Sequence, residues 1–432
     1  MNLYLGVVPF LFTLVTIIII GLKKFKIIFM ILLVAFFLRA GLAFTHAFII
    51  PLPGSQADAV MFEHLGWEWA NDSDRSIFSN FTTGAFIYSW IISILYMFTD
   101  RSPLMIQGIN VFLGTISVYL VWLITMKITN RNKKISSFAA LIVALWPTLN
   151  LYSALTMREE WICFFAILGI YYSVLWWEKN KIIYFLISIS SFLGSLSFHS
   201  GMVIFLAIYC CLILFRWFSS FLQNKGNSFV RQSLLLMVMI GIIVFVSFTS
   251  FGLEKLGKIM NDGLEGLSDQ QAIAARSRAA YLSNLTIQSP VDFLWMTPIR
   301  VLYFLFAPFP WMITNLEDVI GFLDSVMIMW LFYRIYKNKE SIFKNKSALI
   351  IFLFLIGCII MFAIGTSNYG TAIRHRAKLV PLMAILASLR KEKIERKECS
   401  RHHAIQTHPP HHRPQHRRSG DDVVPVVVQN RS

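Results

Sequence analysis

The residue best suited to acid–base chemistry in this sequence is Asp58, in the acidic segment 51–74. That segment is the first long polar interruption of an apolar chain, and it contains five acidic residues but no lysine or arginine. One well-placed carboxylate can take a proton from an acceptor hydroxyl during a single inverting displacement at a sugar carbon. Most loop carboxylates are simply solvated or cap helices, and that alternative stays open here. We therefore treat Asp58 as a candidate catalytic base and Glu63 as a candidate for the cavity around it.

Such a reaction also needs cationic side chains for the leaving group. The planar fork of arginine suits the oxygens of a lipid phosphate or pyrophosphate. We predict that the donor phosphate binds arginines from three later segments, namely Arg276, Arg278, Arg300, Arg374 and Arg376. The last two are the strongest candidates because nearby glycines would let the backbone approach a ligand closely. Taken singly, each arginine could instead be an ordinary base that extends to lipid headgroups.

Four more residues are candidates for the same cavity: Arg158, Glu159, His199 and His375. Glu159 opens an apolar helix, where an acid also favours the helix macrodipole, so a capping role is the competing interpretation. His199 could equally be a polar residue of a helical hairpin. We expect no cofactor and assign no metal ligand, while a divalent metal stays open.

The elements that must position these residues are membrane helices. Of the 432 residues, 56% are hydrophobic and 14% charged, with a mean hydropathy of +0.62, which is typical of a polytopic membrane protein. We predict an all-α fold with about eleven spans, since each run could cross ~30 Å of hydrocarbon. The predicted spans are Leu3–Gly21, Ile27–Phe44, Leu104–Met126, Ser136–Leu155, Trp161–Trp177, Ile182–Ser197, Met202–Phe218, Ser233–Ser250, Val319–Tyr336, Ala348–Ile364 and Leu379–Leu389.

The lysines and arginines between these runs predict the orientation. The net charge of +16 lies largely in short loops and in the tail, so it indicates membrane orientation rather than nucleic-acid binding. The basic loops share the cytoplasmic face if Gly84–Phe98 is an interfacial helix rather than a span. We expect a membrane domain over 1–397, with outer loops at 45–103 (carrying interfacial helices) and 251–318. The His-, Pro- and Arg-rich tail 398–432 is predicted to be disordered and cytoplasmic. This orientation gathers the candidate residues on the extracytoplasmic side of a multi-pass protein of the cell (inner) membrane.

Several segments together resemble a known family. The acidic loop has Asp58 in the setting ADAVMFEHLGWEWA, then the amphipathic stretch IYSWIISILYMFTDRSP, then the apolar run INVFLGTISVYLVWLI with a basic end. This order is similar to the amino-terminal half of GT-C polytopic glycosyltransferases of the protein O-mannosyltransferase and aminoarabinose-transferase type. The late run RHRAKLVPLMAILA also looks like the closing helix of that type. The chain departs from it by an extra amino-terminal helix and by the absence of a large soluble carboxyl-terminal domain.

The resemblance implies a catalytic role for Asp58 and a polyprenyl-phosphate-linked sugar as donor. It also implies a glycan, lipid or protein acceptor, in the assembly of cell-surface polysaccharide or lipopolysaccharide. One alternative is a repeat-unit polymerase or O-antigen ligase that uses the arginines on a pyrophosphate lipid. A second alternative, from another class, is a transporter or flippase. Transporters typically show repeat symmetry between their halves, and no such repeat is visible here.

Overall fold

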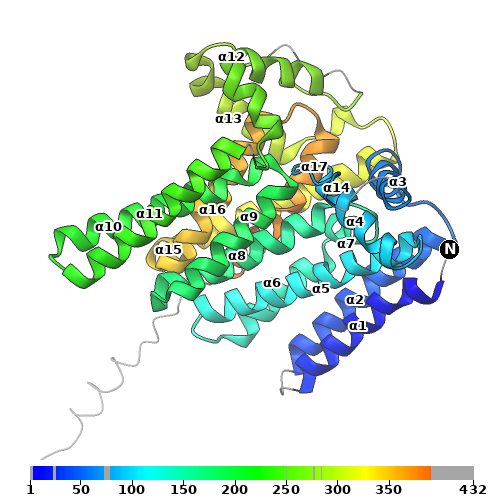
Figure 1. Ribbon diagram of the computed structural model, residues 1–432, viewed down its shortest axis with the longest axis horizontal. Coiled ribbons are helices and arrows are strands. Elements are labelled where there is room, and N and C mark those ends of the chain that lie inside the picture. Colours follow the sequence, from blue (N-terminus) through cyan, green and yellow to red (C-terminus); the bar gives the residue numbers. More distant parts are fainter. Residues whose placement is uncertain are drawn as a thin grey trace, which may run out of the picture. The chain divides into compact units, whose positions relative to one another are not determined.

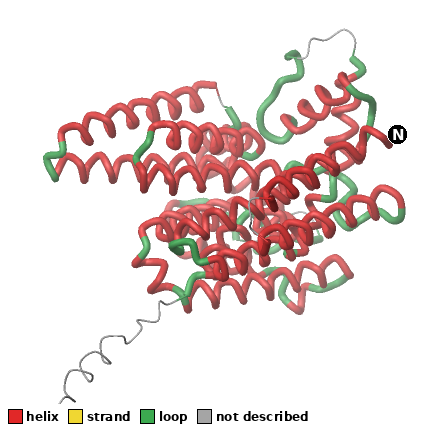
Figure 2. The backbone as a smooth tube through the Cα atoms, turned by 90° about the horizontal axis from the view of Figure 1, so that it is seen from below, coloured by secondary structure: helices red, strands yellow, loops and turns green. Residues whose placement is uncertain are grey.

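The computed structural model describes residues 3–22, 26–72, 78–249, 251–275, 278–283 and 285–390. Within these ranges the regular secondary structure is helical, apart from one isolated bridge between Ala280 and Asn368 (Figure 2). The predicted all-α membrane architecture is therefore confirmed at this coarse level. The expected tail 398–432 lies outside the described residues.

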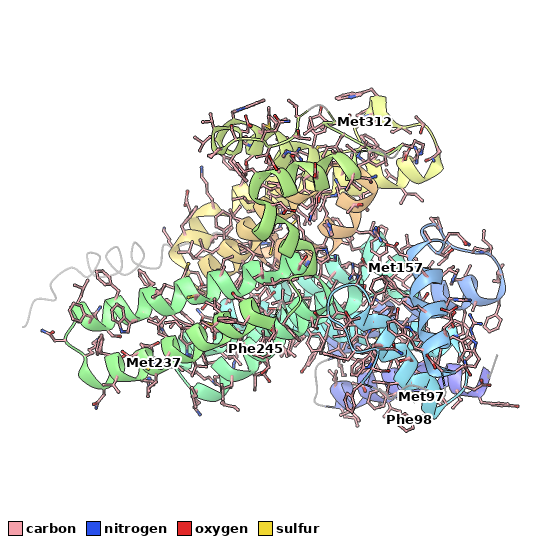
Figure 3. All side chains as sticks on the ribbon, turned by 45° about the horizontal axis from the view of Figure 1, so that its top comes forward. Met97, Phe98, Met157, Met237, Phe245 and Met312 are labelled. Carbon is pink, nitrogen blue, oxygen red and sulfur yellow. The ribbon has the colours of Figure 1, made fainter. Side chains whose placement is uncertain are left out.

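Eight described helices are long and apolar enough to cross a membrane, which needs roughly 20 residues. They are α1 (Leu3–Leu22), α2 (Lys26–Phe48), α5 (Pro103–Ile128), α8 (Glu159–Lys179), α10 (Val203–Leu222), α11 (Gly226–Thr249), α14 (Leu316–Lys337) and α16 (Lys346–Gly365). The peripheral α11 shows how such a span meets lipid, because its Met237 and Phe245 side chains are exposed (Figure 3).

The predicted count of eleven spans is not confirmed, and three runs account for the difference. The run Ser136–Leu155 is broken into α6 (Lys133–Leu145) and α7 (Pro147–Ser153), which are bent by 58°. Pro147 has no N–H to continue a helix, so the chain restarts there, and the two pieces together would make a ninth span.

The other two runs are shorter than expected of a span. α9 (Ile182–Phe198) has 17 residues, and α18 (Val380–Ser388) has only nine. At 1.5 Å per residue α18 is roughly 14 Å long, less than half of the hydrocarbon thickness. All of its residues are buried, so its apolar character reflects packing inside the bundle.

Two helices form in the predicted outer loop 45–103, at the positions expected of interfacial helices. α3 (Asp58–Ala70) and α4 (Ile87–Phe98) pack side by side (Figure 1). Gly66 permits this contact, since a Cβ at this position would lie 2.6 Å from Ile92 Cγ2 and 3.0 Å from the Ser89 carbonyl oxygen. The opposite face of α4 ends in the exposed Met97 and Phe98.

The stretch 251–318, expected to be a loop, is largely helical. α12 (Glu254–Ala274) is followed by α13 (Pro290–Phe306), which starts at a capping box between Ser289 and Asp292. Since Phe304 is fully buried and α13 packs against α14 and α16, α13 belongs to the bundle rather than to its surface. The remaining short elements are η1 (Ser200–Met202), η2 (Pro310–Met312), α15 (Lys339–Lys344) and α17 (Tyr369–Ala377).

Candidate functional site

Asp58 is the first residue of α3, and the start of this helix is fixed by the turn after α7. Thr156 Oγ1 donates a hydrogen bond to the Ala59 carbonyl oxygen at 2.8 Å. The turn itself is held from α5, because Asn110 Nδ2 donates to the carbonyl oxygens of Leu155 and Met157 at 2.7 and 2.9 Å. These contacts make the position of Asp58 a product of tertiary packing.

Arg374, on α17, reaches Asp58 from 316 residues further along the chain. Arg374 Nη1 lies 2.5 Å from Asp58 Oδ2, and the two side chains are 30% and 42% exposed. An ion pair that is partly open to water is a site where a charged ligand can replace one of the partners. The structure thus brings the predicted base, Asp58, into contact with one of the predicted phosphate-binding arginines, Arg374.

The amino-terminal end of α8 adds a buried carboxylate behind this pair. Glu159 is 6% exposed, and its Oε2 atom has no hydrogen-bond partner among the described residues. Burial lowers the pKa of Arg374, but the charges of Glu159 and Asp58 outweigh it, so the net pKa is raised and the guanidinium stays charged. Arg158 precedes Glu159, and its Nη1 donates to the Phe198 carbonyl oxygen at 2.6 Å.

The two histidines predicted for the site, His199 and His375, are in contact with each other. The rings of His199 and His375 are 4.9 Å apart and nearly perpendicular, and His375 stacks on Phe362 at 4.5 Å. His375 Nδ1 also lies 3.1 Å from Lys378 Nζ. The electrostatic coupling of Lys378 to both Glu159 and Arg374 connects these rings to the Asp58–Arg374 pair.

Arg376 does not share this site, although it was predicted to bind the donor phosphate. Its side chain is fully buried, and Nη1 donates to the carbonyl oxygens of Leu305 and Ala307 at 2.8 and 2.7 Å. These carbonyls lie at the carboxyl-terminal end of α13, where a cation also compensates the helix dipole. Arg376 Nη2 is 3.2 Å from Oδ2 of the buried Asp324. Arg376 is therefore a packing residue that joins α13, α14 and α17.

Arg300 is likewise engaged inside the protein. It is fully buried on α13, and Nη2 donates to Gln271 Oε1 at 2.9 Å and to the Leu285 carbonyl oxygen. A ligand could reach it only after these bonds break. Its predicted role in phosphate binding is therefore not supported by its position.

Arg278 forms a separate polar cluster. Its Nη1 and Nη2 donate to the two carboxylate oxygens of Asp318 at 2.8 and 3.2 Å, and Tyr369 OH donates to Asp318 Oδ1 at 2.9 Å. Thr314 adds backbone and hydroxyl donors to Asp318 Oδ2. This cluster ties the loop after α12 to the starts of α14 and α17. Arg276 lies outside the described residues.

The carboxylate of Glu63 is also bound by neighbouring side chains of the protein. Arg101 binds it through Nε and Nη2 at 2.9 and 2.6 Å, and Tyr96 OH donates to Oε1 at 3.0 Å. Burial and the Glu63 charge raise the pKa of Tyr96, so its hydroxyl keeps the proton that it donates. Glu63 thus fastens α3 to α4 and to the start of α5.

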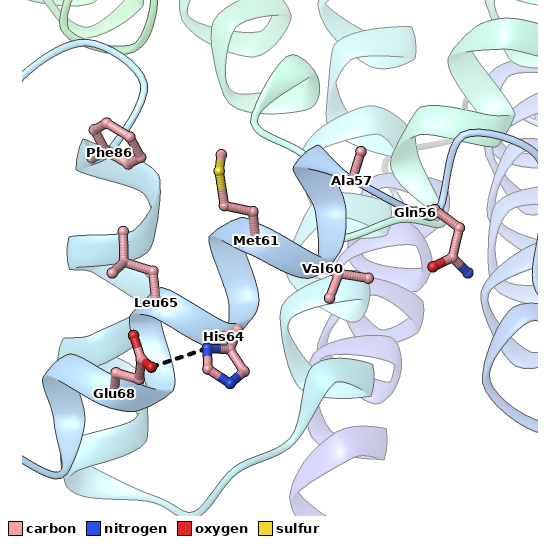
Figure 4. Close-up of a pocket in the computed structure, with 8 residues that line it drawn as sticks. All are labelled: Gln56, Ala57, Val60, Met61, His64, Leu65, Glu68 and Phe86. Carbon is pink, nitrogen blue, oxygen red and sulfur yellow. Dashed lines mark ion pairs between the residues drawn. The ribbon is translucent and has the colours of Figure 1, made fainter.

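A shallow groove runs along one face of α3, from Gln56 and Ala57 to Glu68 (Figure 4). Its volume is about 550 Å³, and most of its wall is apolar, including Val60, Met61 and Phe86. At the far end His64 Nδ1 lies 3.3 Å from Glu68 Oε1, an interaction drawn as a dashed line in the figure.

Sequence reasoning missed Lys378 and Asp324, although the sequence carried a signal for both. Asp324 is a charged residue inside an otherwise apolar run, and Lys378 is the last charged residue before the apolar run 379–389; charged residues in such places normally have a partner or a function. Among the described residues, no group of three His, Cys, Asp or Glu side chains could hold a metal ion. No residue is predicted as a metal ligand, and a divalent metal stays open. Asp72 and Asp74 have the spacing of a carboxylate pair, but Asp74 lies outside the described residues.

Comparison of the chain with protein-family models and with curated proteins gives no match.

Proposed function

We propose that the protein is a membrane glycosyltransferase that moves a sugar from a polyprenyl-phosphate-linked donor to a glycan, lipid or protein acceptor on the extracytoplasmic face. The observation that carries this proposal is the contact between Asp58 and Arg374. A carboxylate that can accept a hydroxyl proton and a guanidinium that can hold a phosphate are the two groups that one inverting displacement requires.

The ion pair suggests how the two groups would work in sequence. Asp58 is the counter-ion of Arg374 in the structure. A donor phosphate is a stronger, potentially bidentate partner for the guanidinium and would replace the carboxylate there. Asp58 would then be available to the hydroxyl of an acceptor. Attack of that oxygen on the sugar carbon would expel the lipid phosphate on the opposite side.

The proposal also accounts for the surroundings of the pair. An apolar groove runs along α3, the helix that begins at Asp58, and such a groove suits a substrate that carries a lipid chain. Behind Arg374, the Glu159 carboxylate holds the guanidinium in its charged form.

The test is transfer of labelled sugar in proteoliposomes. The donors are polyprenyl monophosphates that carry glucose, galactose or mannose, and the acceptor pool is a lipid and glycan extract. Wild-type protein should transfer at least one of these sugars, and Asp58→Asn should abolish transfer at unchanged protein level. Full activity of Asp58→Asn would refute the assignment of the base.

A polymerase or O-antigen ligase is the runner-up, and it would use Arg374 and Arg376 with Arg276 or Arg278 on a pyrophosphate. The geometry favours it less, since Arg376 is buried against α13 and Arg278 is paired with Asp318. The broken pair α6–α7 is a feature that transporters also have. Movement of a labelled lipid across the bilayer without any transfer would favour that class.

A further inference from the structure

Lys378 is a buried cation that the proposed transfer does not yet use. It lies between α17 and α18 and is 3% exposed. Its Nζ atom is 3.1 Å from His375 Nδ1 and 5.8 Å from the centre of the Phe362 ring. His375 stacks on that same ring, so the lysine and the imidazole are held together by one aromatic surface.

The distance between the two nitrogens limits how many protons they carry. An ammonium group can donate to an unprotonated Nδ1, or a protonated Nδ1 can donate to a neutral amine. Two protonated groups in contact would repel each other strongly in a buried position. Lys378 and His375 therefore carry at most one positive charge between them, and we call them the shared-proton pair.

The groups around the pair make that proton easy to move near neutral pH. Burial, as the largest cause, lowers the pKa of Lys378 to about 7. The charges of Arg158 and Arg374 lower this pKa further, whereas the Glu159 and Cys163 side chains raise it. The ring of His375 also lies 4.9 Å from that of His199, whose Nδ1 accepts the Gly201 N–H at 3.1 Å. That bond places a proton of His199 on Nε2.

We propose that the shared-proton pair is a proton source for the phosphate that leaves in the proposed transfer, with Lys378 acting through His375 as a positioning residue. The inference rests on the proposed function. It follows from the position of the pair. His375 is next to Arg374 on α17, Lys378 follows directly after that helix, and the Arg374 charge acts on Lys378.

The acceptor oxygen forms a bond to the sugar carbon, and the bond from that carbon to the phosphate oxygen breaks with its electron pair on the phosphate. The acceptor proton passes to Asp58. The proton on His375 Nε2 passes to a phosphate oxygen, while Nδ1 takes a proton from the Lys378 ammonium group. Asp58 then releases its proton to water, and the pair takes one proton back from water.

The kinetic test compares pH profiles of sugar transfer from a polyprenyl monophosphate hexose between pH 5.5 and 9.5. In wild-type protein the rate should fall on the alkaline side of about pH 7, where the pair loses its proton. Lys378→Met should lower the rate by about 10²- to 10⁴-fold, the usual contribution of proton transfer, and remove that alkaline limb. Lys344→Met, at an exposed lysine of α15, is the control and should keep both rate and limb. A Lys378→Met profile that superimposes on that of wild type would overturn the proposal.

A second measurement uses wild-type protein without substrate, so it does not depend on the folding of a variant. The nitrogen spectrum of ¹⁵N-labelled histidine, with the His375 signal identified by its loss in His375→Gln, reports which ring nitrogen carries the proton. The His375 proton should move from Nε2 below about pH 7 to Nδ1 above it, as Lys378 becomes neutral. A single tautomer from pH 6 to 8.5 would refute the shared proton whatever the transfer assay gives. Conversely, a tautomer change together with a fully active Asp58→Asn protein would leave the pair standing and remove the proposed function.

Discussion

Asp58→Asn and Asp324→Asn form a matched test, because the structure pairs each aspartate with an arginine of α17. Asp58 contacts Arg374 at 2.5 Å, with side chains 42% and 30% exposed. Asp324 lies 3.2 Å from Arg376, with side chains 2% and 0% exposed. The two substitutions are chemically identical, and only the surroundings of the carboxylates differ.

The expected magnitudes follow from this difference in exposure. Ion pairs open to water typically contribute ~0.2–1 kcal/mol, so Asp58→Asn should change the free energy of unfolding by no more than about 1 kcal/mol. Removal of one partner from a buried pair costs about 3–5 kcal/mol, because the Arg376 charge would be left uncompensated. Sugar transfer should show the reverse order, with Asp58→Asn losing about 10²- to 10⁴-fold or more.

The assay is thermal unfolding in detergent together with transfer in proteoliposomes, on both variants at equal protein. Asp58→Asn should unfold near the wild-type temperature and be inactive, whereas Asp324→Asn should unfold at a clearly lower temperature. If Asp58→Asn is as destabilised as Asp324→Asn, then Asp58 is a packing residue and its loss of activity says nothing of catalysis.

Three further predictions concern other positions. Arg374→Lys keeps the charge but loses the planar fork, so donor KM should rise several-fold while detergent stability stays within about 1 kcal/mol of wild type; an unchanged KM would argue against phosphate binding. Gly66→Ala should destabilise the protein by ~1–3 kcal/mol, since the new methyl group would meet Ile92 and the Ser89 carbonyl oxygen, whereas Gly41→Ala in α2 has open space and should be neutral or stabilising by up to about 1 kcal/mol. Because burial lowers the pKa of Lys378 to about 7 from 10.5, the unfolded chain binds a proton that the folded protein lacks between these values. The free energy of unfolding should therefore rise across this pH window, by up to about 1.4 kcal/mol per pH unit, and Lys378→Met should flatten that rise in a pH series of chemical unfolding.

The sequence supported the membrane class and the two surface helices because both depend on local pattern. Long apolar runs identify most of the spans, and the acidic segment around Asp58 begins the helix that packs on α4. The break at Trp146–Pro147 was also readable, since proline cannot continue a helix in its interior. The prediction treated that stretch as one span because it weighed apolar length alone.

The roles of the arginines could not be read in the same way. Arg374 and Arg376 are two residues apart and chemically identical, but one contacts Asp58 and the other binds the carbonyl end of α13. Whether a cation meets a ligand or a neighbouring helix end depends on tertiary packing, which periodicity and charge do not encode. Arg300 illustrates the same point, since its partners on α12 and near α17 come from distant segments.

The buried contacts of Arg376 also limit which substitutions the sequence can accept during evolution. Residues two positions apart on a helix, such as Arg374 and Arg376, are about 200° apart around its axis. Because the contacts of Arg376 hold its side chain toward the protein interior, the Arg374 side chain points outward. A substitution at Asp324 or Arg376 alone would allow α17 to rotate about its axis. The Arg374 side chain would then move away from Asp58, although no contact joins it to either substituted residue. In a library of active variants, positions 324 and 376 should therefore change together or not at all.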